Sequence, residues 1–323
     1  MGKDTGWKGF LSDDARYADV INGVACKGEQ VIKKEDLQEM DTQTGMFRGP
    51  KFIHKLTQSR KGNVKVRDCL RKVAFGTNFS IIGIENQETM DYSIPLRNMS
   101  YDVDAYERQA IKIRKETRKK HKGLSAGEYL YGFKKDDKLL PAVTFILYSG
   151  SKSWDGPKTL HEILDFTDIP AGLKEMVSDY QINLVEIREL EDTSVFKTDV
   201  KQVFDFIRCS NDKKALKELV DTDDYYKNME EDAFDVAVQY TNATELIEAK
   251  EYYEKDGEVD MCKALTDLIE SGRAEGKEIG KDEKLREQVE KKVKKGLSIP
   301  EIADALEEKV KDIEKIVAEL QTK

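Results

Sequence analysis

The pattern of apolar and polar positions along the first third of the chain predicts one helix followed by two strands. Apolar residues recur at helical spacing over 12–25, and Ser12 is placed to cap this helix. Residues 63–70 alternate between apolar and polar side chains, which predicts a strand. Residues 79–84 form a nearly continuous apolar, β-branched run, which is typical of a strand buried on both faces.

The strongest helical pattern covers residues 93–122. Ser93 can cap its N-terminus, and one apolar stripe runs along the helix. The stripe consists of Leu96, Met99, Val103, Tyr106, Ala110 and Ile113. A different face carries Arg97, Tyr101 and Arg108, and the last turns are almost entirely basic. The pattern predicts a helix that packs its apolar stripe against a core.

Two further strands are predicted over 139–148 and 182–187. A helix, strands, a helix and a strand in this order predict an α/β core with a central sheet. Beyond residue 210 the pattern is helical and acidic, and no further strand is predicted. Residues 272–280 read as a glycine-spaced hinge or a loose helix. Residues 285–320 predict a helix, a turn at Gly296, and one or two more helices that begin at Ser298.

These patterns divide the chain into three regions. We expect an α/β domain over 1–210, an acidic helical region over 211–270, and a hinge with a helical tail over 271–323. The tail has the layout of a small helix-turn-helix. Its acidic helices fit self-association at least as well, which would make the protein a homo-oligomer through its C-terminal helices.

Charge is distributed unevenly along the chain. The net charge of −9, from 63 acidic and 54 basic residues, taken alone argues against a nucleic-acid partner. Residues 1–165 carry 29 Lys and Arg against 23 Asp and Glu, a net +6, whereas the remainder carries 25 against 40, a net −15. The window 44–135 holds 20 bases and 9 acids, a net +11. Local charge therefore favours a polyanion site in this basic window.

Composition excludes several classes of protein. No run approaches the roughly 18 apolar residues that a membrane-spanning helix needs, and the first residues lack the apolar core of a signal peptide. The four cysteines and three histidines are too scattered for zinc-ligand spacing, and no hydrolase triad or phosphate-binding loop is recognisable. We therefore expect a cytoplasmic protein with free thiols and no membrane partner.

Acidic and amide residues lie at the ends of the predicted strands. Asp68 ends the strand over 63–70, and Glu85 and Gln87 follow the apolar run of the next strand. Glu85 and Gln87 are two residues apart and share a face, and Asp68 can lie beside Glu85. Carboxylate and amide oxygens suit Mg²⁺ or Mn²⁺, and Asp19 on the first helix is a further candidate ligand. The plain alternative is that these acids meet solvent or cap helices.

The candidate metal site lies inside the basic window. A metal ion can activate water and offset the charge that builds on a phosphodiester during attack. Basic residues around a carboxylate–metal centre are what such a substrate requires. The residues predicted to contact DNA are Arg67, Arg71, Arg97, Tyr101 and Arg108.

The order of several segments resembles the Rpn family of recombination-promoting nucleases, also described as YhgA-like putative transposases, within the PD-(D/E)xK nuclease superfamily. The segments are RYADVINGV, VRDCLRKVAFG, IIGIENQ, IPLRNMSYDVDAYERQ, TFILYSG, WDGPKTL, DYQINLVEI, TDVKQVFDFIRC and KKGLSIPEIADAL. The resemblance covers most of the chain. It implies a restriction-endonuclease-like core with a mixed central sheet flanked by helices, followed by an all-α C-terminal region.

By this resemblance, Asp68 and Glu85 bind the metal ion, and Asp19 matches the acid on the first helix. Gln87 takes the place of the superfamily's lysine, although an uncharged amide is neither a general base nor a cation. E-x-Q variants are common in the family, so the substitution does not imply loss of activity. Arg97 or a second metal ion is the candidate to compensate for the missing lysine.

Three functional hypotheses follow. The first is a metal-dependent DNA endonuclease, associated with recombination or mobile elements, in which Asp68, Glu85 and Gln87 are catalytic. The second is a catalytically silent DNA-binding or protein-interaction factor that retains the nuclease fold. The third is that the acidic half shields the basic site, or mimics DNA, until a partner or substrate displaces it.

Overall fold

A five-stranded mixed sheet lies at the centre of the computed structural model, which describes residues 3–40, 69–75, 78–119, 123–240, 244–248 and 250–321. The strands follow the order β1 (Leu37–Glu39), β2 (Cys69–Phe75), β3 (Asn78–Gln87), β4 (Ala142–Tyr148) and β5 (Asn183–Glu186). β1, β2 and β3 are antiparallel, whereas β3, β4 and β5 are parallel. The predicted α/β class with a mixed central sheet is confirmed, and it is consistent with a nuclease-like core.

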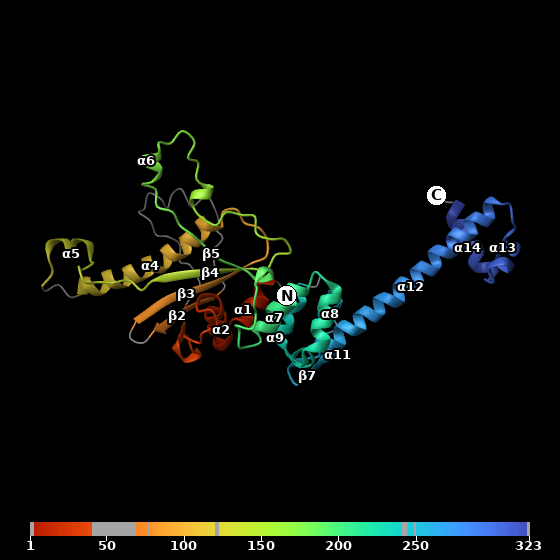
Figure 1. The fold of residues 1–323 in the computed structure, drawn as a ribbon, viewed down its shortest axis with the longest axis horizontal. Coiled ribbons are helices and arrows are strands. Elements are labelled where there is room, and N and C mark those ends of the chain that lie inside the picture. Colours follow the sequence, from red (N-terminus) through yellow and green to blue (C-terminus); the bar gives the residue numbers. More distant parts are fainter. Residues whose placement is uncertain are drawn as a thin grey trace.

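Helices cover both faces of this sheet (Figure 1). One face is covered by α4 (Ile94–Lys119), whose Tyr106 hydroxyl accepts a hydrogen bond from the Ala142 amide of β4 at 3.1 Å. The other face packs against α1 (Lys3–Phe10), α2 (Asp14–Ala25) and α7 (Val200–Cys209). The α2 residue Tyr17 donates its hydroxyl hydrogen to the carbonyl of Ile82 in β3 at 2.7 Å. Asp13 rather than Ser12 caps α2, because its side chain accepts the amide hydrogens of the first turn.

The side chains of β3 point alternately to the two faces of the sheet. Ile82 and Ile84 are buried in the apolar core on the α2 side. Residues of the other parity, including Glu85 and Gln87, face α4. The core is therefore apolar on one side of β3, while the last residues of the strand on the other side are polar.

The main core continues past residue 210, where the α/β domain was predicted to end. Phe234 and Ala237 of α9 (Glu231–Val238) are fully buried in the same cluster as Trp7 of α1. The Trp7 indole also donates to the hydroxyl of Tyr240 at 2.7 Å. α8 (Lys213–Thr222) and the first turns of α12 (Met261–Lys294) add to this cluster. The C-terminal half therefore contributes to the core that supports the sheet.

A small second sheet lies where no strand was predicted. Its strands are β6 (Met229–Glu230), β7 (Glu254–Lys255) and β8 (Glu258–Val259), in the order β6-β8-β7. The prediction was wrong because two-residue strands are too short to produce a periodic pattern. β7 and β8 are joined by Asp256 and Gly257, which both have positive φ, as in the two-residue turns of tight hairpins.

α12 is one continuous helix of 34 residues. Its length is about 51 Å at 1.5 Å per residue. Residues 272–280, predicted as a hinge or a loose helix, are helical and lie within it. The Lys, Glu and Ala residues between the glycines are strong helix formers, which offsets the cost of each glycine.

α12 carries a separate helical unit away from the sheet (Figure 1). This unit contains α13 (Ile299–Leu306) and α14 (Val310–Gln321), which pack with the end of α12 around Val289, Ile302 and Ile313. The predicted turn at Gly296 and the cap at Ser298 are confirmed. Self-association through these helices stays a prediction.

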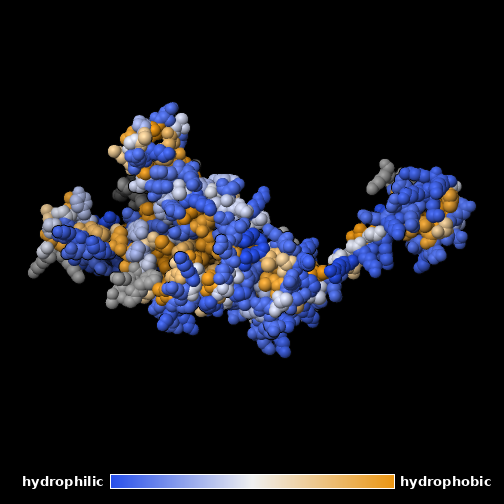
Figure 2. All heavy atoms as spheres, in the orientation of Figure 1, coloured by the Kyte–Doolittle hydropathy of each residue, from blue (hydrophilic) through white to orange (hydrophobic). Residues whose placement is uncertain are grey.

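Short elements complete the described chain. They are η1 (Lys34–Asp36), α5 (Ala126–Tyr131), η2 (His161–Ile163), α6 (Ala171–Lys174), η3 (Ile187–Glu189), η4 (Asp224–Lys227), α10 (Thr244–Glu248) and α11 (Lys250–Tyr253). Hydrophilic residues dominate the face of the molecule drawn in Figure 2. Among the described helices, none combines the length and the apolar character that crossing a bilayer requires.

Candidate active site

The C-terminal end of β3 carries two polar side chains that are buried under α4. Glu85 and Gln87 are each 8% exposed. Here β3 runs parallel to β4, with Glu85 opposite Ile146 and Gln87 opposite Tyr148. Ligand sites of α/β sheets gather at the carboxyl ends of parallel strands. A buried carboxylate and a buried amide at this end of β3 therefore indicate a functional site.

Arg97, in the first turn of α4, places its guanidinium group on this pair. Its Nη2 atom lies 3.2 Å from Glu85 Oε1 and donates to Gln87 Oε1 at 2.5 Å. Its Nη1 atom lies 2.8 Å from Asp91 Oδ2. The buried Nε atom of Arg97 has no hydrogen-bond partner among the residues that the structure describes. One guanidinium group thus joins two carboxylates and an amide.

Tyr101 adds a hydroxyl group one helical turn further along α4. The hydroxyl donates to Glu85 Oε1 at 3.3 Å, and the side chain is buried. We refer to Glu85, Gln87, Asp91, Arg97 and Tyr101 as the Glu85–Arg97 cluster. Four of its five members were selected from the sequence, and Asp91 was missed because nothing in its spacing marks it.

The amide of Gln87 has a fixed orientation within the cluster. Its Nε2 atom donates to the carbonyl oxygen of Thr89, so its Oε1 atom is the one that faces Arg97. The cluster therefore presents a carboxylate, an oriented amide and a guanidinium group. Arg97 thus places a positive charge next to Gln87, the uncharged residue that, by the resemblance, takes the place of the superfamily's lysine.

The donor atoms of the cluster fit a hard cation, but the described residues do not complete a metal site. Glu85 and Gln87 supply carboxylate and amide oxygens, which Mg²⁺ accepts as ligands. In the described part of the chain, no group of three or more His, Cys, Asp or Glu side chains is arranged to hold a metal ion. Asp68 and Arg67 lie outside the described residues. Asp68 directly precedes Cys69, the first residue of β2 and the partner of Ile84 in β3.

Asp19 lies in a different environment from the one predicted for a metal ligand. Its carboxylate accepts hydrogen bonds from the amides of Lys197 and Thr198 and from the Thr198 hydroxyl, at 2.7 to 2.9 Å. These groups belong to the turn before α7. Asp19 thus anchors α7 to α2 on the face of the sheet opposite Glu85.

Arg71 also lies on the α2 face. It is 4% exposed, its Nε atom donates to Asp14 Oδ1 at 2.9 Å, and its guanidinium lies 5.2 Å from the ring centroid of Tyr17. This side chain is buried and already paired within the fold, and its contact with DNA stays a prediction. Arg108 is partly exposed on α4, and its Nε atom donates to Asp104 at 2.7 Å.

A buried polar network holds α4 against the sheet next to the cluster. Asp102 accepts hydrogen bonds from Thr144 Oγ1 at 2.8 Å and from the Tyr180 hydroxyl at 2.6 Å. Asn98 donates to the same Tyr180 hydroxyl at 2.9 Å. No sequence pattern marks this network, because Tyr180 is 78 residues from Asp102. The network fixes the helix that presents Arg97 and Tyr101.

Burial also shifts two pKa values at this end of the sheet. The pKa of Tyr148, the partner of Gln87 in β4, is raised by burial and by the nearby charges of Asp155 and Glu186. The pKa of Arg188 is lowered by burial. Its Nε atom donates to the Gly150 carbonyl at 2.9 Å. Both groups lie outside the Glu85–Arg97 cluster as defined above.

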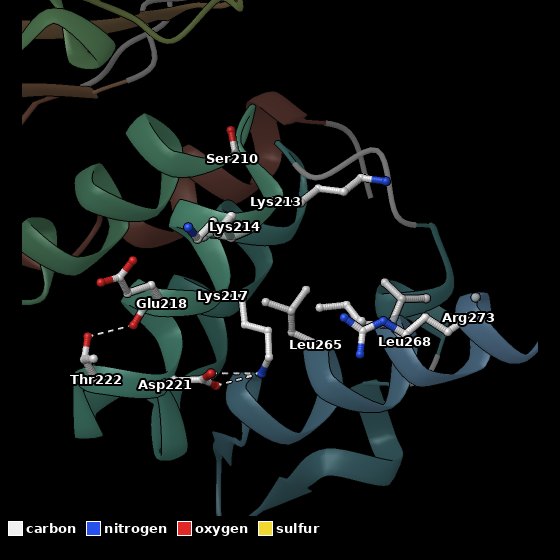
Figure 3. Close-up of a pocket in the computed structure, with 13 residues that line it drawn as sticks. Ser210, Lys213, Lys214, Lys217, Glu218, Asp221, Thr222, Leu265, Leu268 and Arg273 are labelled. Atoms are coloured by element: carbon white, nitrogen blue, oxygen red, sulfur yellow. Dashed lines mark hydrogen bonds and ion pairs between the residues drawn. The ribbon is translucent and has the colours of Figure 1, made fainter.

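A groove of about 1040 Å³ lies between α8 and α12 (Figure 3). Leu265 and Leu268 line it, Lys213 and Arg273 lie at its rim, and Lys217 is paired with Asp221 at 2.9 Å. None of its lining residues belongs to the Glu85–Arg97 cluster. The groove offers apolar surface and paired charges rather than a reacting group, so we place the candidate active site at the end of β3.

Comparison with known proteins gives one match. A family described as "Putative transposase, YhgA-like" matches residues 65–233, which is more than half of the chain. The matched segment runs from just before β2 to α9 and includes the whole Glu85–Arg97 cluster. No curated protein and no solved structure matches the chain. The chain therefore belongs to the family of YhgA-like putative transposases.

Proposed function

We propose that this protein is a metal-dependent DNA endonuclease that acts in recombination or on mobile elements. Membership in a family of transposase-like proteins makes DNA the expected substrate. The observation that carries the chemical part is the contact of Arg97 with both Glu85 Oε1 and Gln87 Oε1. This contact supplies a positive charge beside an E-x-Q motif, where the superfamily pattern has a lysine.

Glu85 and Asp68 are the proposed ligands of Mg²⁺ or Mn²⁺. Asp68 directly precedes Cys69 in the sequence. Cys69 pairs with Ile84, the neighbour of Glu85. In this proposal both carboxylates hold the same ion. A divalent ion bound there would lower the pKa of a water molecule and offset charge on the phosphodiester.

Arg97 is the proposed electrostatic partner of the reacting phosphate. Negative charge grows on the phosphoryl oxygens as the water oxygen forms a new bond to phosphorus and the bond to one ester oxygen breaks. A guanidinium group held in place before the reaction stabilises this charge without reorganisation. The leaving oxygen takes a proton from solvent.

Gln87 is the proposed orienting residue. Neither its amide nor the Arg97 guanidinium can accept a proton at neutral pH. The proton of the attacking water therefore passes to the carboxylate of Glu85 or Asp68 or to bulk solvent. The hydrogen bond from Gln87 to the Thr89 carbonyl keeps the amide oxygen turned into the cluster.

Plasmid nicking in Mg²⁺, in Mn²⁺ and in EDTA tests this proposal. We expect Glu85→Gln and Asp68→Asn each to lower cleavage at least about 100-fold, because each removes a charge from the site. Glu218→Gln, at an exposed carboxylate of α8, is the matched control and should cleave like the wild type. Circular dichroism checks that the variants are folded. Undiminished cleavage by the double variant would refute the site assignment.

A catalytically silent DNA-binding factor is the second candidate function. It is favoured by Gln87, which is uncharged where the superfamily has a lysine. In that case no divalent ion supports cleavage, and salt-sensitive DNA binding survives the loss of both carboxylates. Cleavage that depends on Glu85 would exclude this alternative.

A further inference from the structure

The second half of α4 leaves the sheet and forms an arm with α5. Gln109 marks where the arm starts, because its side chain accepts from the Leu140 amide at 2.7 Å and donates to the Leu140 carbonyl at 3.1 Å. We call the described residues 110–119 and 123–139 the α4–α5 arm. Figure 1 shows α5 at one extremity of the molecule and the C-terminal helices at the other. The arm therefore extends the α4 side of the sheet into solvent.

The arm carries an excess of positive charge. Its described residues, 110–119 and 123–139, contain 8 Lys and Arg against 4 Asp and Glu. Two of the acids are held by local backbone: Glu128 accepts from the Ser125 amide at 2.8 Å, and Asp137 accepts from the Lys134 amide at 2.7 Å. The basic residues are Lys112, Arg114, Lys115, Arg118, Lys119, Lys134, Lys135 and Lys138.

The tip of the arm exposes large side chains that a globular protein normally buries. Leu130 is 67% exposed and Tyr131 is 71% exposed, both at the end of α5. Gly132, which follows with a φ of 67°, packs against Arg114 of α4 and fixes α5 on the basic helix. Exposed aromatic residues grouped with cations are typical of surfaces on which nucleic-acid bases stack.

One helix connects this tip to the candidate active site. Tyr101 of α4 contacts Glu85, and Lys115 lies 14 residues further along the same helix. At 1.5 Å per residue the two positions are about 21 Å apart. A DNA strand with one phosphate per 3.4 Å covers this distance in about six nucleotides.

We propose that the α4–α5 arm binds a single-stranded DNA segment that begins about six nucleotides from the cleavage position. The lysines of α4 contact its phosphates, and its unpaired bases stack on the tyrosines of α5. This inference rests on the proposed DNA substrate, and it adds where and in which form the substrate is held. The charge of the arm and its continuity with the Glu85–Arg97 cluster favour DNA over an anionic membrane surface.

Binding of fluorescent DNA to the full-length protein in EDTA tests the arm without cleavage. The probes are a blunt duplex, the same duplex with a single-stranded overhang, and a single strand. We expect the overhang probe to bind more tightly than the blunt duplex. Tyr131→Ala should weaken overhang binding about tenfold and leave blunt-duplex binding unchanged. Lys112→Ala with Lys115→Ala should reduce the slope of log affinity against log salt by about 1.4 for the single strand.

The matched control removes two positive charges from a different surface of the protein. Lys213→Ala with Lys217→Ala, on α8, should leave both the affinity and the salt slope unchanged. All substituted side chains are wholly or partly exposed, and circular dichroism verifies that the variants are folded. Equal loss on blunt and overhang probes would rule out stacking. Tighter binding to phosphatidylserine vesicles than to DNA, lost in the arm variants, would replace DNA with a membrane as the occupant.

The outcome is separable from that of the proposed endonuclease. If the arm variants lose overhang binding while the wild type cleaves no DNA, the arm inference stands and the endonuclease proposal fails. If the wild type cleaves DNA and the arm variants bind every probe as it does, the arm inference fails alone.

Discussion

Buried charged side chains have different contacts on the two faces of the central sheet. On the α2 side, Arg16 is buried and contacts Asp199, Glu230 and Asp232 at 2.5 to 2.8 Å. Its pKa is raised, because these hydrogen bonds and charges outweigh the effect of burial. On the α4 side, the Arg97 guanidinium lies at the open end of β3, and its buried Nε atom lacks a hydrogen-bond partner among the described residues.

This difference distinguishes the charges that hold the fold together from those of the candidate active site. Charges on the α2 side join elements that are far apart in the chain, and their donors and acceptors are used within the fold. On the α4 side Asp102 also holds the fold together, but the charges of the Glu85–Arg97 cluster are gathered at one strand end, with a carboxylate and an amide oxygen turned toward the same cation. Removing a charge should therefore cost mainly stability on the α2 side, and should cost activity within the Glu85–Arg97 cluster.

The largest effect is expected for Arg16→Leu. It leaves Asp199 buried without its cation, which should lower the free energy of unfolding by about 3–5 kcal/mol. Lys217→Leu removes an exposed partner of Asp221 and should cost less than about 1 kcal/mol. Urea denaturation measures both. An Arg16 variant as stable as the wild type would contradict a structural role for this face.

The next effect is expected for Arg97→Ala. Cleavage should fall about 100-fold, which corresponds to about 2.7 kcal/mol of lost transition-state stabilisation. The free energy of unfolding should also fall, because Glu85, whose side chain is 10% exposed, loses its cation, so cleavage is compared under conditions in which circular dichroism shows both proteins folded. Adding Gln87→Lys should restore part of the activity by returning a cation to the superfamily position. Single-turnover cleavage measures this rescue, and a double variant no faster than Arg97→Ala would argue against charge replacement.

A smaller effect is expected for Asp19→Asn. The variant keeps one acceptor oxygen but loses the charge that receives the amides of Lys197 and Thr198, so stability should fall by about 1–3 kcal/mol. Metal binding, followed by Mn²⁺ titration calorimetry of the folded protein, should be unchanged. Loss of Mn²⁺ binding with unchanged stability would instead make Asp19 a metal ligand.

The third hypothesis, shielding by the acidic half, gains no support from the arrangement within one chain. In Figure 1 the helices α12, α13 and α14 extend away from α4 and its arm. α9 belongs to the C-terminal half, and its Phe234 and Ala237 are buried in the core instead of covering the basic surface. The acidic half thus has a structural role that its composition did not indicate.

Much of the fold could be predicted from periodicity. The spacing of apolar residues predicted α2, α4 and the strands β3, β4 and β5 close to their observed ranges, since burial of one face imposes a regular repeat. The buried face of α4 was predicted wrongly, because Leu96 and Val103 of the apolar stripe are 50% and 39% exposed, whereas Tyr101 and Asp102 are buried. The strands β6, β7 and β8 were missed because two residues cannot show a repeat. Residues 272–280, predicted as a hinge or a loose helix, are helical because helix-forming neighbours keep α12 intact.

The candidate site could be predicted only in part. Glu85, Gln87, Arg97 and Tyr101 were identified because strand and helix spacing places them on defined faces. Sequence alone could not separate Arg97 from Arg71, or Glu85 from Asp19, since all are charged residues on amphipathic elements. These residues are distinguished by the groups that contact them, and Lys197, which donates to Asp19, lies 178 residues away.

The sequence by itself determined the α/β class, the basic window and the polar end of β3, because these depend on local repeats and local charge. Tertiary structure decided which charged residues stabilise the fold and which are gathered at the strand end. The physical reason is that a buried charge takes its role from the groups packed around it, and here those groups come from distant segments of the chain.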